Sequence, residues 1–260
     1  MNHWTDLSIE FASQRNYLDE LFKIYPVVPE GIRDIDSEKW DCVENAFNKK
    51  DKTSLLKLLL AMELFPIKDS YVAYLKRDPS AITRNPATVS RLYGRLKEMG
   101  LDEIWERCSE PKETNRQIGP MFRRWLKKGT LGAPLLSLDE FEKTKKNAIL
   151  DAGDSEMMSF AERKFGYRRE KGLDFVAKFG GKYVIGEAKF LTDFGGHQNA
   201  QFADAITTLE AKTTRVIKIG ILDGVLYIRG KNKMYREITT KRAKHNIMSA
   251  LVLREFLYQI

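Results

Sequence analysis

The chain has 260 residues, of which 43% are hydrophobic and 31% charged, a composition typical of a globular protein with a sizeable core. Its 44 Lys and Arg outnumber its 36 Asp and Glu, and this basic surplus favours a polyanionic partner such as nucleic acid without establishing one. Two widely spaced cysteines exclude a disulfide scaffold and a zinc module. No apolar run approaches a membrane span and the N-terminus lacks a signal-peptide pattern, so a cytoplasmic location is expected.

The first half of the chain is expected to be mainly helical. Helical spacing of apolar residues predicts a short helix around Leu18–Phe22, a second from Ser37 to Phe47, and a third from Thr53 to just before Pro66. None of these segments carries an obvious chemical group, so they are interpreted as scaffold.

A better-defined helix is predicted between residues 85 and 100. Asn85 fits the N-cap, Pro86 the first helical position and Gly100 the terminating position. The stretch Thr88-Val89-Ser90-Arg91 is similar to recognition helices of winged-helix DNA-binding proteins. A capped surface helix with solvated arginines is an equal alternative. The candidates for DNA contact in this region are Arg84, Asn85, Arg91 and Arg95.

A second basic helix is expected after residues 115–117, with Met121, Phe122 and Trp125 facing inward and Gly129 ending it. Arg, Asn and Gln side chains match guanine and adenine edges in the major groove, which permits base readout here. A solvated basic face explains the same residues. The candidates for DNA contact are Asn115, Arg116, Gln117, Arg123 and Arg124.

Residues 129–134 contain two glycines and a proline and are the expected boundary between two lobes packed together. Residues 1–133 would form a mainly helical region and residues 134–260 a second region. In the second region, the capping-box pattern of residues 137–140 opens one helix, and a second helix is predicted from Asp154 to Lys164.

Two strands joined by a tight turn carry the most informative residues. Gly180-Gly181 predicts a two-residue hairpin turn between strands at residues 172–179 and 182–190. This turn pairs residue 179 with residue 182, which sets Asp174 across from Glu187, with Cβ atoms about 4.5–5.5 Å apart. Lys189 points to the same side because side chains alternate along a strand. Facing carboxylates repel, and a divalent cation between them would remove the conflict.

The segments after the hairpin complete a small mixed sheet. A helix is expected from His197 to Lys212 and a buried strand from Arg215 to Leu222, joined to the hairpin as a right-handed parallel crossover. Asp223-Gly224 is expected to turn the chain into residues 225–228, and residues 248–258 to close as a helix. The predicted fold class is α/β, an α+β mixed sheet with helices on both faces.

The glycine-rich turn before residue 197 could present backbone N–H groups to phosphate. A polar helix cap is an equal interpretation of the same stretch. The candidates for DNA contact are His197, Gln198, Asn199 and Gln201.

An Asp on one strand followed by Glu-x-Lys on the next resembles the PD-(D/E)xK nuclease superfamily, and the chain as a whole resembles a type II restriction endonuclease. Leu173-Asp174 stands in place of Pro-Asp. The motif-level match covers about the last 110 residues, a domain-sized span. The resemblance implies that residues 134–260 form a restriction-endonuclease-like catalytic core and that the mainly helical residues 1–133 form a DNA-recognition region. It also implies that Asp174, Glu187 and Lys189 are catalytic. The competing interpretation is an ordinary polar face of a hairpin.

Mg²⁺ is the expected ion because it takes oxygen ligands and keeps water molecules that a phosphate can displace. Asp174, Glu187 and the backbone carbonyl of Ala188 would hold it, with Glu162 on the preceding helix as an additional carboxylate. A solvated glutamate on a helix is the alternative for Glu162.

The expected function is Mg²⁺-dependent cleavage of double-stranded DNA at a short specific sequence. Cleavage of both strands of a palindrome favours a homodimer, and a restriction enzyme implies a protecting DNA methyltransferase as functional neighbour. One alternative is a structure-specific nuclease such as a junction resolvase or repair nickase. Another is a non-catalytic DNA-binding regulator, which predicts Mg²⁺-independent binding without cleavage. An RNA-processing enzyme is disfavoured because no aromatic stacking motif is present.

Overall fold

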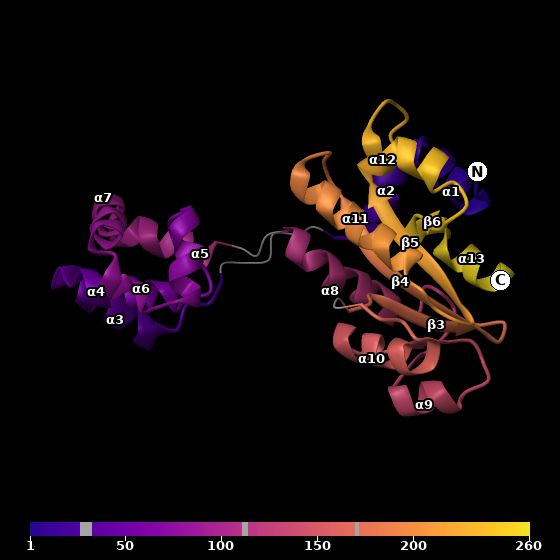
Figure 1. The fold of residues 1–260 in the computed structure, drawn as a ribbon, viewed down its shortest axis with the longest axis horizontal. Helices are drawn as coiled ribbons and strands as arrows, with labels where there is room; N and C mark the ends of the chain where they lie inside the picture. Colours follow the sequence, from indigo (N-terminus) through magenta and orange to yellow (C-terminus); the bar gives the residue numbers. More distant parts are fainter. Residues whose placement is uncertain (27–32, 111–113, 170–171) are drawn as a thin grey trace. The chain divides into compact units, whose positions relative to one another are not determined.

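The computed structural model describes residues 1–26, 33–110, 114–169 and 172–260 (Figure 1). It divides into two compact units. Met1–Val27 and Thr114–Ile260 form one, called unit 1 here, and Val28–Glu113 form the other, called unit 2. The expected boundary at residues 133 and 134 therefore falls inside unit 1. The physical reason is helix α8 (Thr114–Lys127), whose apolar residues, Met121 and Phe122 among them, are part of the core around the sheet.

Unit 1 is built on a six-stranded mixed sheet within the described residues, with strand order β1-β2-β3-β4-β5-β6. The pairs β2–β3 and β3–β4 are antiparallel, and the other pairs are parallel. This arrangement confirms the predicted α/β class. The strands are β1 (Leu135–Leu136), β2 (Ala148–Leu150), β3 (Phe175–Phe179), β4 (Lys182–Leu191), β5 (Val216–Gly224) and β6 (Asn246–Met248).

The β3–β4 hairpin has the predicted turn and register. Gly180 and Gly181 both have positive φ, 54° and 76°, which the favoured two-residue turn requires. Phe179 pairs with Lys182, and the ladder continues to Phe175 opposite Gly186. The register that sets Asp174 toward Glu187 is therefore confirmed.

Helices cover both faces of the sheet (Figure 1). On the face that carries Glu187 lie α10 (Asp154–Phe165), where Phe160 contacts Tyr183, and α11 (Gly196–Glu210). On the opposite face lie α8 and α13 (Leu253–Gln259), which contact β3 through ring pairs at Phe175 and Phe179. The other helical elements of unit 1 are α1 (His3–Ala12), α2 (Tyr17–Ile24), α9 (Leu138–Lys143), η1 (Val225–Tyr227), α12 (Lys233–Arg236), η2 (Glu237–Lys241) and η3 (Ala250–Val252).

The C-terminal part differs from the prediction. Asp223 and Gly224 end β5 instead of forming a turn outside it, and residues 225–227 form a 3₁₀ helix. Gly224 has φ 100° and packs so closely on β4 that a Cβ there would overlap the carbonyl oxygen of Leu191. The closing helix begins only at Leu253, because residues 246–248 pair with β5 as strand β6.

Unit 2 is helical over its described residues and has its own apolar core, which includes Leu55, Leu59 and Leu92. Gly100, with φ 75°, interrupts α7 where the sequence predicts a helix end. Asn85 does not cap α7 with its side chain; its amide donates to the carbonyl oxygen of Ala81 at 2.7 Å. The helices are α3 (Ser37–Asn48), α4 (Lys52–Leu60), α5 (Ser70–Arg77), α6 (Ala81–Arg84) and α7 (Pro86–Ser109).

Within the described parts of the chain, no helix is both long enough and apolar enough to span a membrane.

Candidate active site

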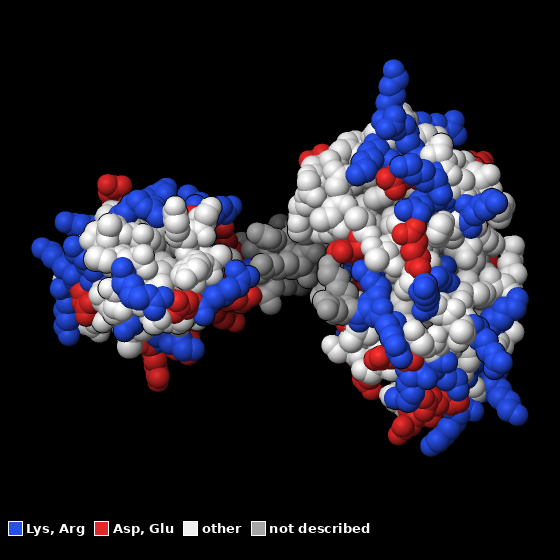
Figure 2. All heavy atoms as spheres, viewed as in Figure 1, with Lys and Arg blue, Asp and Glu red and all other residues white. Residues whose placement is uncertain are grey.

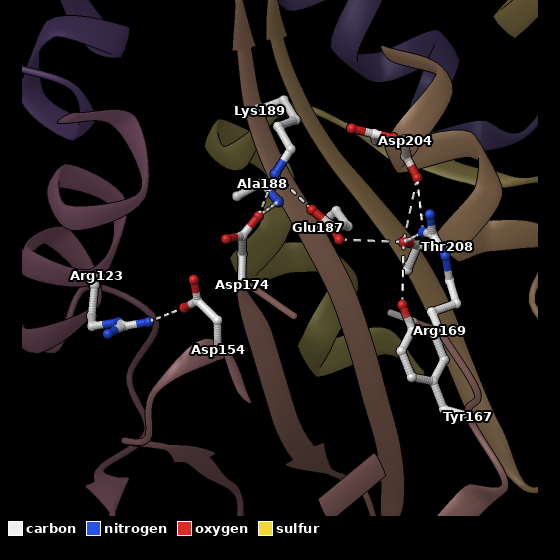
Figure 3. Close-up of polar contacts among 10 residues, drawn as sticks. All are labelled: Arg123, Asp154, Tyr167, Arg169, Asp174, Glu187, Ala188, Lys189, Asp204 and Thr208. Carbon is white, nitrogen blue, oxygen red and sulfur yellow. Dashed lines mark hydrogen bonds and ion pairs between the residues drawn. The ribbon is translucent and has the colours of Figure 1, made fainter. Parts of the chain in front are cut away.

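The β3–β4 hairpin brings Asp174, Glu187 and Lys189 together (Figure 3). Asp174 immediately precedes β3, and its backbone N–H donates to the Gly186 carbonyl at 3.2 Å. Its Oδ2 accepts the Ala188 backbone N–H at 2.9 Å. Glu187 and Lys189 lie two residues apart on β4 and therefore share one face. The hairpin thus fixes the Asp174 carboxylate both by its ladder and by a direct bond to β4.

The Lys189 ammonium group lies between the two carboxylates. Its Nζ donates to Asp174 Oδ2 at 2.8 Å and to Glu187 Oε2 at 2.6 Å. Both distances are typical of charge-assisted hydrogen bonds. The positive charge of Lys189 thus lies between the two carboxylates and offsets their mutual repulsion.

Burial governs the electrostatics of this cluster. Glu187 is only 3% exposed, and desolvation together with the nearby Asp174 carboxylate raises its pKa to about 7. Burial alone would lower the pKa of Lys189, but Asp174 and Glu187 outweigh it and raise that pKa above its usual value. The site therefore holds a protonated lysine beside a carboxylate whose charge is incompletely compensated.

These residues fit a hard divalent cation. Two carboxylates converge on one point, and Ala188 has its backbone beside them. Oxygen donors of this kind suit Mg²⁺. Glu162 does not join them: it is exposed on α10, and in the described part of the chain no group of three or more His, Cys, Asp or Glu side chains is placed to hold a metal ion. A metal here would depend on Asp174, Glu187 and a backbone carbonyl.

Five residues of α8 were predicted to contact DNA, and the structure describes the side chains of two of them, Arg123 and Arg124. Residues 115–117 belong to α8 itself instead of preceding it, and their side chains are outside the described set. Arg123 forms an ion pair with Asp154 at 2.5 Å (Figure 3). The carbonyl oxygen of Asp154 accepts the N–H of Leu173, the neighbour of Asp174. Arg124 is exposed on the same helix.

The segment after β4 is held by its own hydrogen bonds. Gln198 is buried, and its side chain bonds the Thr192 N–H and hydroxyl at 3.3 and 3.2 Å. The Asn199 amide donates to the carbonyl oxygens of residues 194 and 195. His197 is exposed and contacts Gln201 at 2.9 Å. Of the four candidates, His197 is exposed, Asn199 and Gln201 are half-buried, and Gln198 is buried.

On unit 2, the predicted residues are engaged with acidic partners or line cavities. Arg84 pairs with Asp78 at 2.6 Å, and Arg91 pairs with Asp69 at 2.5 Å. Arg95 lines a separate cleft on this unit. A cavity of about 440 Å³ at the start of α7 is lined by Tyr71, Tyr74, Leu75, Arg84, Asn85 and Thr88.

Three polar residues next to Glu187 Oε1 were not predicted from the sequence: Thr208, Tyr167 and Arg169. Thr208 on α11 lies 3.4 Å from Glu187 Oε1, and Tyr167 and Arg169 both contact the Thr208 hydroxyl (Figure 3). No local motif marks these residues, because the fold brings them together across about 20–40 positions of sequence. Thr208 falls outside the apolar side of the helix predicted from His197 to Lys212, which carries Phe202, Ile206 and Leu209, so the helical pattern did not point to it either.

The basic surplus belongs entirely to unit 1. Unit 2 has 15 Lys and Arg against 16 Asp and Glu, which leaves 29 against 20 for unit 1. Figure 2 shows Lys and Arg side chains spread widely over the visible face of unit 1. The unit that holds the carboxylate–lysine cluster is therefore also the one with the charge to attract a polyanion.

Comparison with known proteins identifies the family. No curated protein and no solved structure matches the chain. The family model described as Tsp45I type II restriction enzyme matches residues 2–260, nearly the whole sequence. The chain therefore belongs to the Tsp45I type II restriction enzyme family and is a site-specific deoxyribonuclease.

Proposed function

We propose that this enzyme hydrolyses both strands of double-stranded DNA at a short sequence, with Mg²⁺ held at the β3–β4 hairpin. The observation that carries this proposal is the Lys189 ammonium group bridging the Asp174 and Glu187 carboxylates. Burying Glu187 beside a second carboxylate costs stability, and clusters of this kind are concentrated at functional sites.

Asp174, Glu187 and the Ala188 carbonyl would hold the ion. When bound, Mg²⁺ would polarise the scissile phosphate and lower the pKa of a water molecule. Lys189 acts as a donor: it already donates to both carboxylates, and the same ammonium can donate to a phosphate oxygen as negative charge develops there. Asp174 keeps its position through the Ala188 N–H.

We assign recognition chiefly to unit 2 and catalysis to unit 1, a revision of the division at residue 133. The cavity at the start of α7 combines aromatic faces with an arginine and an amide. Tyr71 and Tyr74 are 63% and 61% exposed, so their rings are accessible to a ligand, and the Arg91 guanidinium lies 5.6 Å from the centre of the Tyr71 ring. Tyrosine rings, Arg and Asn are suited to contacts with bases and phosphates.

Arg84 and Arg77 provide a matched comparison for this assignment, since both are exposed arginines of unit 2 but only Arg84 lines the cavity. Arg84→Ala should weaken binding to cognate DNA by about tenfold, on the order of one lost contact. Arg77→Ala should bind within about twofold of the unaltered enzyme. Equal binding by the two variants would remove the cavity from recognition.

We also propose a homodimer, since two-fold symmetry places one active site on each strand of a palindrome. A DNA methyltransferase protecting the same sequence is the proposed functional neighbour.

Sequencing of the fragment ends from digested phage DNA tests the proposal. One short shared sequence, cut at symmetric positions on both strands, is the expected result. Ends without a shared sequence, or breaks in one strand only, would favour a structure-specific nuclease instead.

A further inference from the structure

The two carboxylate oxygens of Glu187 have separate surroundings (Figure 3). Oε2 faces Lys189 at 2.6 Å, whereas Oε1 lies 3.4 Å from the hydroxyl of Thr208 on α11. Thr208 is fully buried, and Glu187 nearly so. The side of Glu187 away from Lys189 is therefore in contact with a buried hydroxyl of another element.

The partners of Thr208 determine where its hydroxyl proton can go. Arg169 Nη1 lies 2.5 Å from Thr208 Oγ1, and a guanidinium group only donates, so this contact occupies a lone pair of the hydroxyl oxygen. Tyr167 OH lies 3.4 Å away and can occupy the second lone pair. The single hydroxyl proton of Thr208 is then free for an acceptor.

Besides the Tyr167 hydroxyl oxygen, two acceptors lie within reach of that proton, both at 3.4 Å: Glu187 Oε1 and the carbonyl oxygen of Asp204. The Asp204 carbonyl already accepts Arg169 Nη1 at 3.0 Å. A carboxylate is also the stronger acceptor, because hydrogen bonds to ionised groups are roughly twice as strong as neutral ones. The arrangement therefore favours donation from Thr208 to Glu187.

We propose that Arg169 and Thr208 are positioning residues for Glu187: Arg169 orients the Thr208 hydroxyl, which holds Glu187 Oε1 and leaves Oε2 turned toward Asp174 and Lys189. This inference rests on the proposed role of Glu187 as a ligand of a divalent cation. Outer partners of metal ligands fix ligand orientation, and their loss typically costs about 10–100-fold in metal affinity or activity.

Paired substitutions separate this role from simple packing. Thr208→Val keeps the side-chain shape and removes the hydroxyl, whereas Thr208→Ser keeps the hydroxyl and removes the methyl group. Arg169→Met removes the donor and keeps much of the stem. Arg169 is only half-buried, so this variant carries the test if Thr208→Val does not fold.

The first measurement is Mn²⁺ binding to the full chain without DNA, monitored by electron paramagnetic resonance. The Mn²⁺ binding that the Glu187→Gln variant loses is taken as binding at the hairpin site. Thr208→Val and Arg169→Met should each bind Mn²⁺ at least about tenfold more weakly. Thr208→Ser should bind within about twofold of the unaltered enzyme. The double variant Thr208→Val/Arg169→Met should be no weaker than either single variant, because both residues act through one hydroxyl.

The Mg²⁺ concentration that half-saturates cleavage should shift in the same order. Wild-type Mn²⁺ affinity in a folded Thr208→Val variant, or equal losses in Thr208→Ser and Thr208→Val, would overturn the positioning role alone. No site-specific Mn²⁺ binding by the unaltered enzyme would overturn the metal site itself, and this inference with it.

Discussion

Lys189 Nζ lies 2.6 Å from Glu187 Oε2, although the two residues are separated by one position on β4. Alternation along the strand puts both side chains on one face, so a single strand supplies a carboxylate and its neutralising cation. Asp174 then completes the cluster from the position just before the neighbouring strand β3. The relative positions of Asp174, Glu187 and Lys189 are therefore set by the register of the β3–β4 hairpin.

Lys189→Ala should keep DNA binding and lose cleavage. The ammonium group donates to both carboxylates and is placed to stabilise charge on a phosphate, and removing one such donor typically costs about 10²–10³-fold in rate. Single-turnover cleavage and a gel-shift assay in EDTA would measure the two properties. Lys182→Ala, an exposed lysine on the same strand, is the control and should cleave normally. Equal cleavage by both variants would exclude Lys189 from the mechanism.

Gly186→Ala should disturb the site through the backbone. A Cβ at residue 186 would lie 2.7 Å from both the Ile219 carbonyl oxygen and its side chain, so β4 and β5 would have to separate next to Glu187. We expect a loss of about 1–3 kcal/mol in the free energy of unfolding, typical of overpacking, with reduced cleavage. Gly153→Ala is the control because no atom lies within 4 Å of its added Cβ. Similar urea midpoints for the two variants would show that β4 and β5 tolerate the methyl group.

Asp223 should make stability depend on pH. It is fully buried, and desolvation raises its pKa to about 6, although bonds from Ser249, the Ala250 N–H and Tyr25 oppose that rise. Between about pH 4 and 6 the unfolded chain releases this proton while the folded protein keeps it, so stability falls as pH rises. At about 1.4 kcal/mol for each pKa unit, the loss is up to about 3 kcal/mol.

Asp223→Asn removes this titration, and its difference from the unaltered enzyme isolates the Asp223 contribution. Urea unfolding at pH 4, 5, 6 and 7 should show the advantage of the unaltered enzyme over the variant shrinking across this range. A difference that stays constant with pH would mean that Asp223 has the same pKa in the folded and unfolded states.

The features predicted correctly are those determined by residues close together in the sequence. Gly180-Gly181 specifies the turn, and alternation on the two strands specifies which residues face each other, so the juxtaposition of Asp174, Glu187 and Lys189 follows from local rules. The capping box at residues 137–140 is equally local and is present as predicted.

The features that were missed depend on contacts distant in sequence. Asp223-Gly224 has the composition of a turn, but burial against Tyr25 and Ser249 keeps Asp223 in the sheet. Thr208 carries no motif at all. The division of the chain likewise depends on where α8 packs, which composition at residues 129–134 does not reveal.

Cleavage of plasmid and phage DNA with Mg²⁺ or with EDTA, beside a Glu187→Ala variant, tests the central claim most directly. The account predicts discrete fragments that require Mg²⁺ and disappear in the variant, which should still shift DNA in a gel. Discrete fragments from Glu187→Ala, or cleavage that persists in EDTA, would contradict the assignment of the β3–β4 hairpin as the metal-dependent active site.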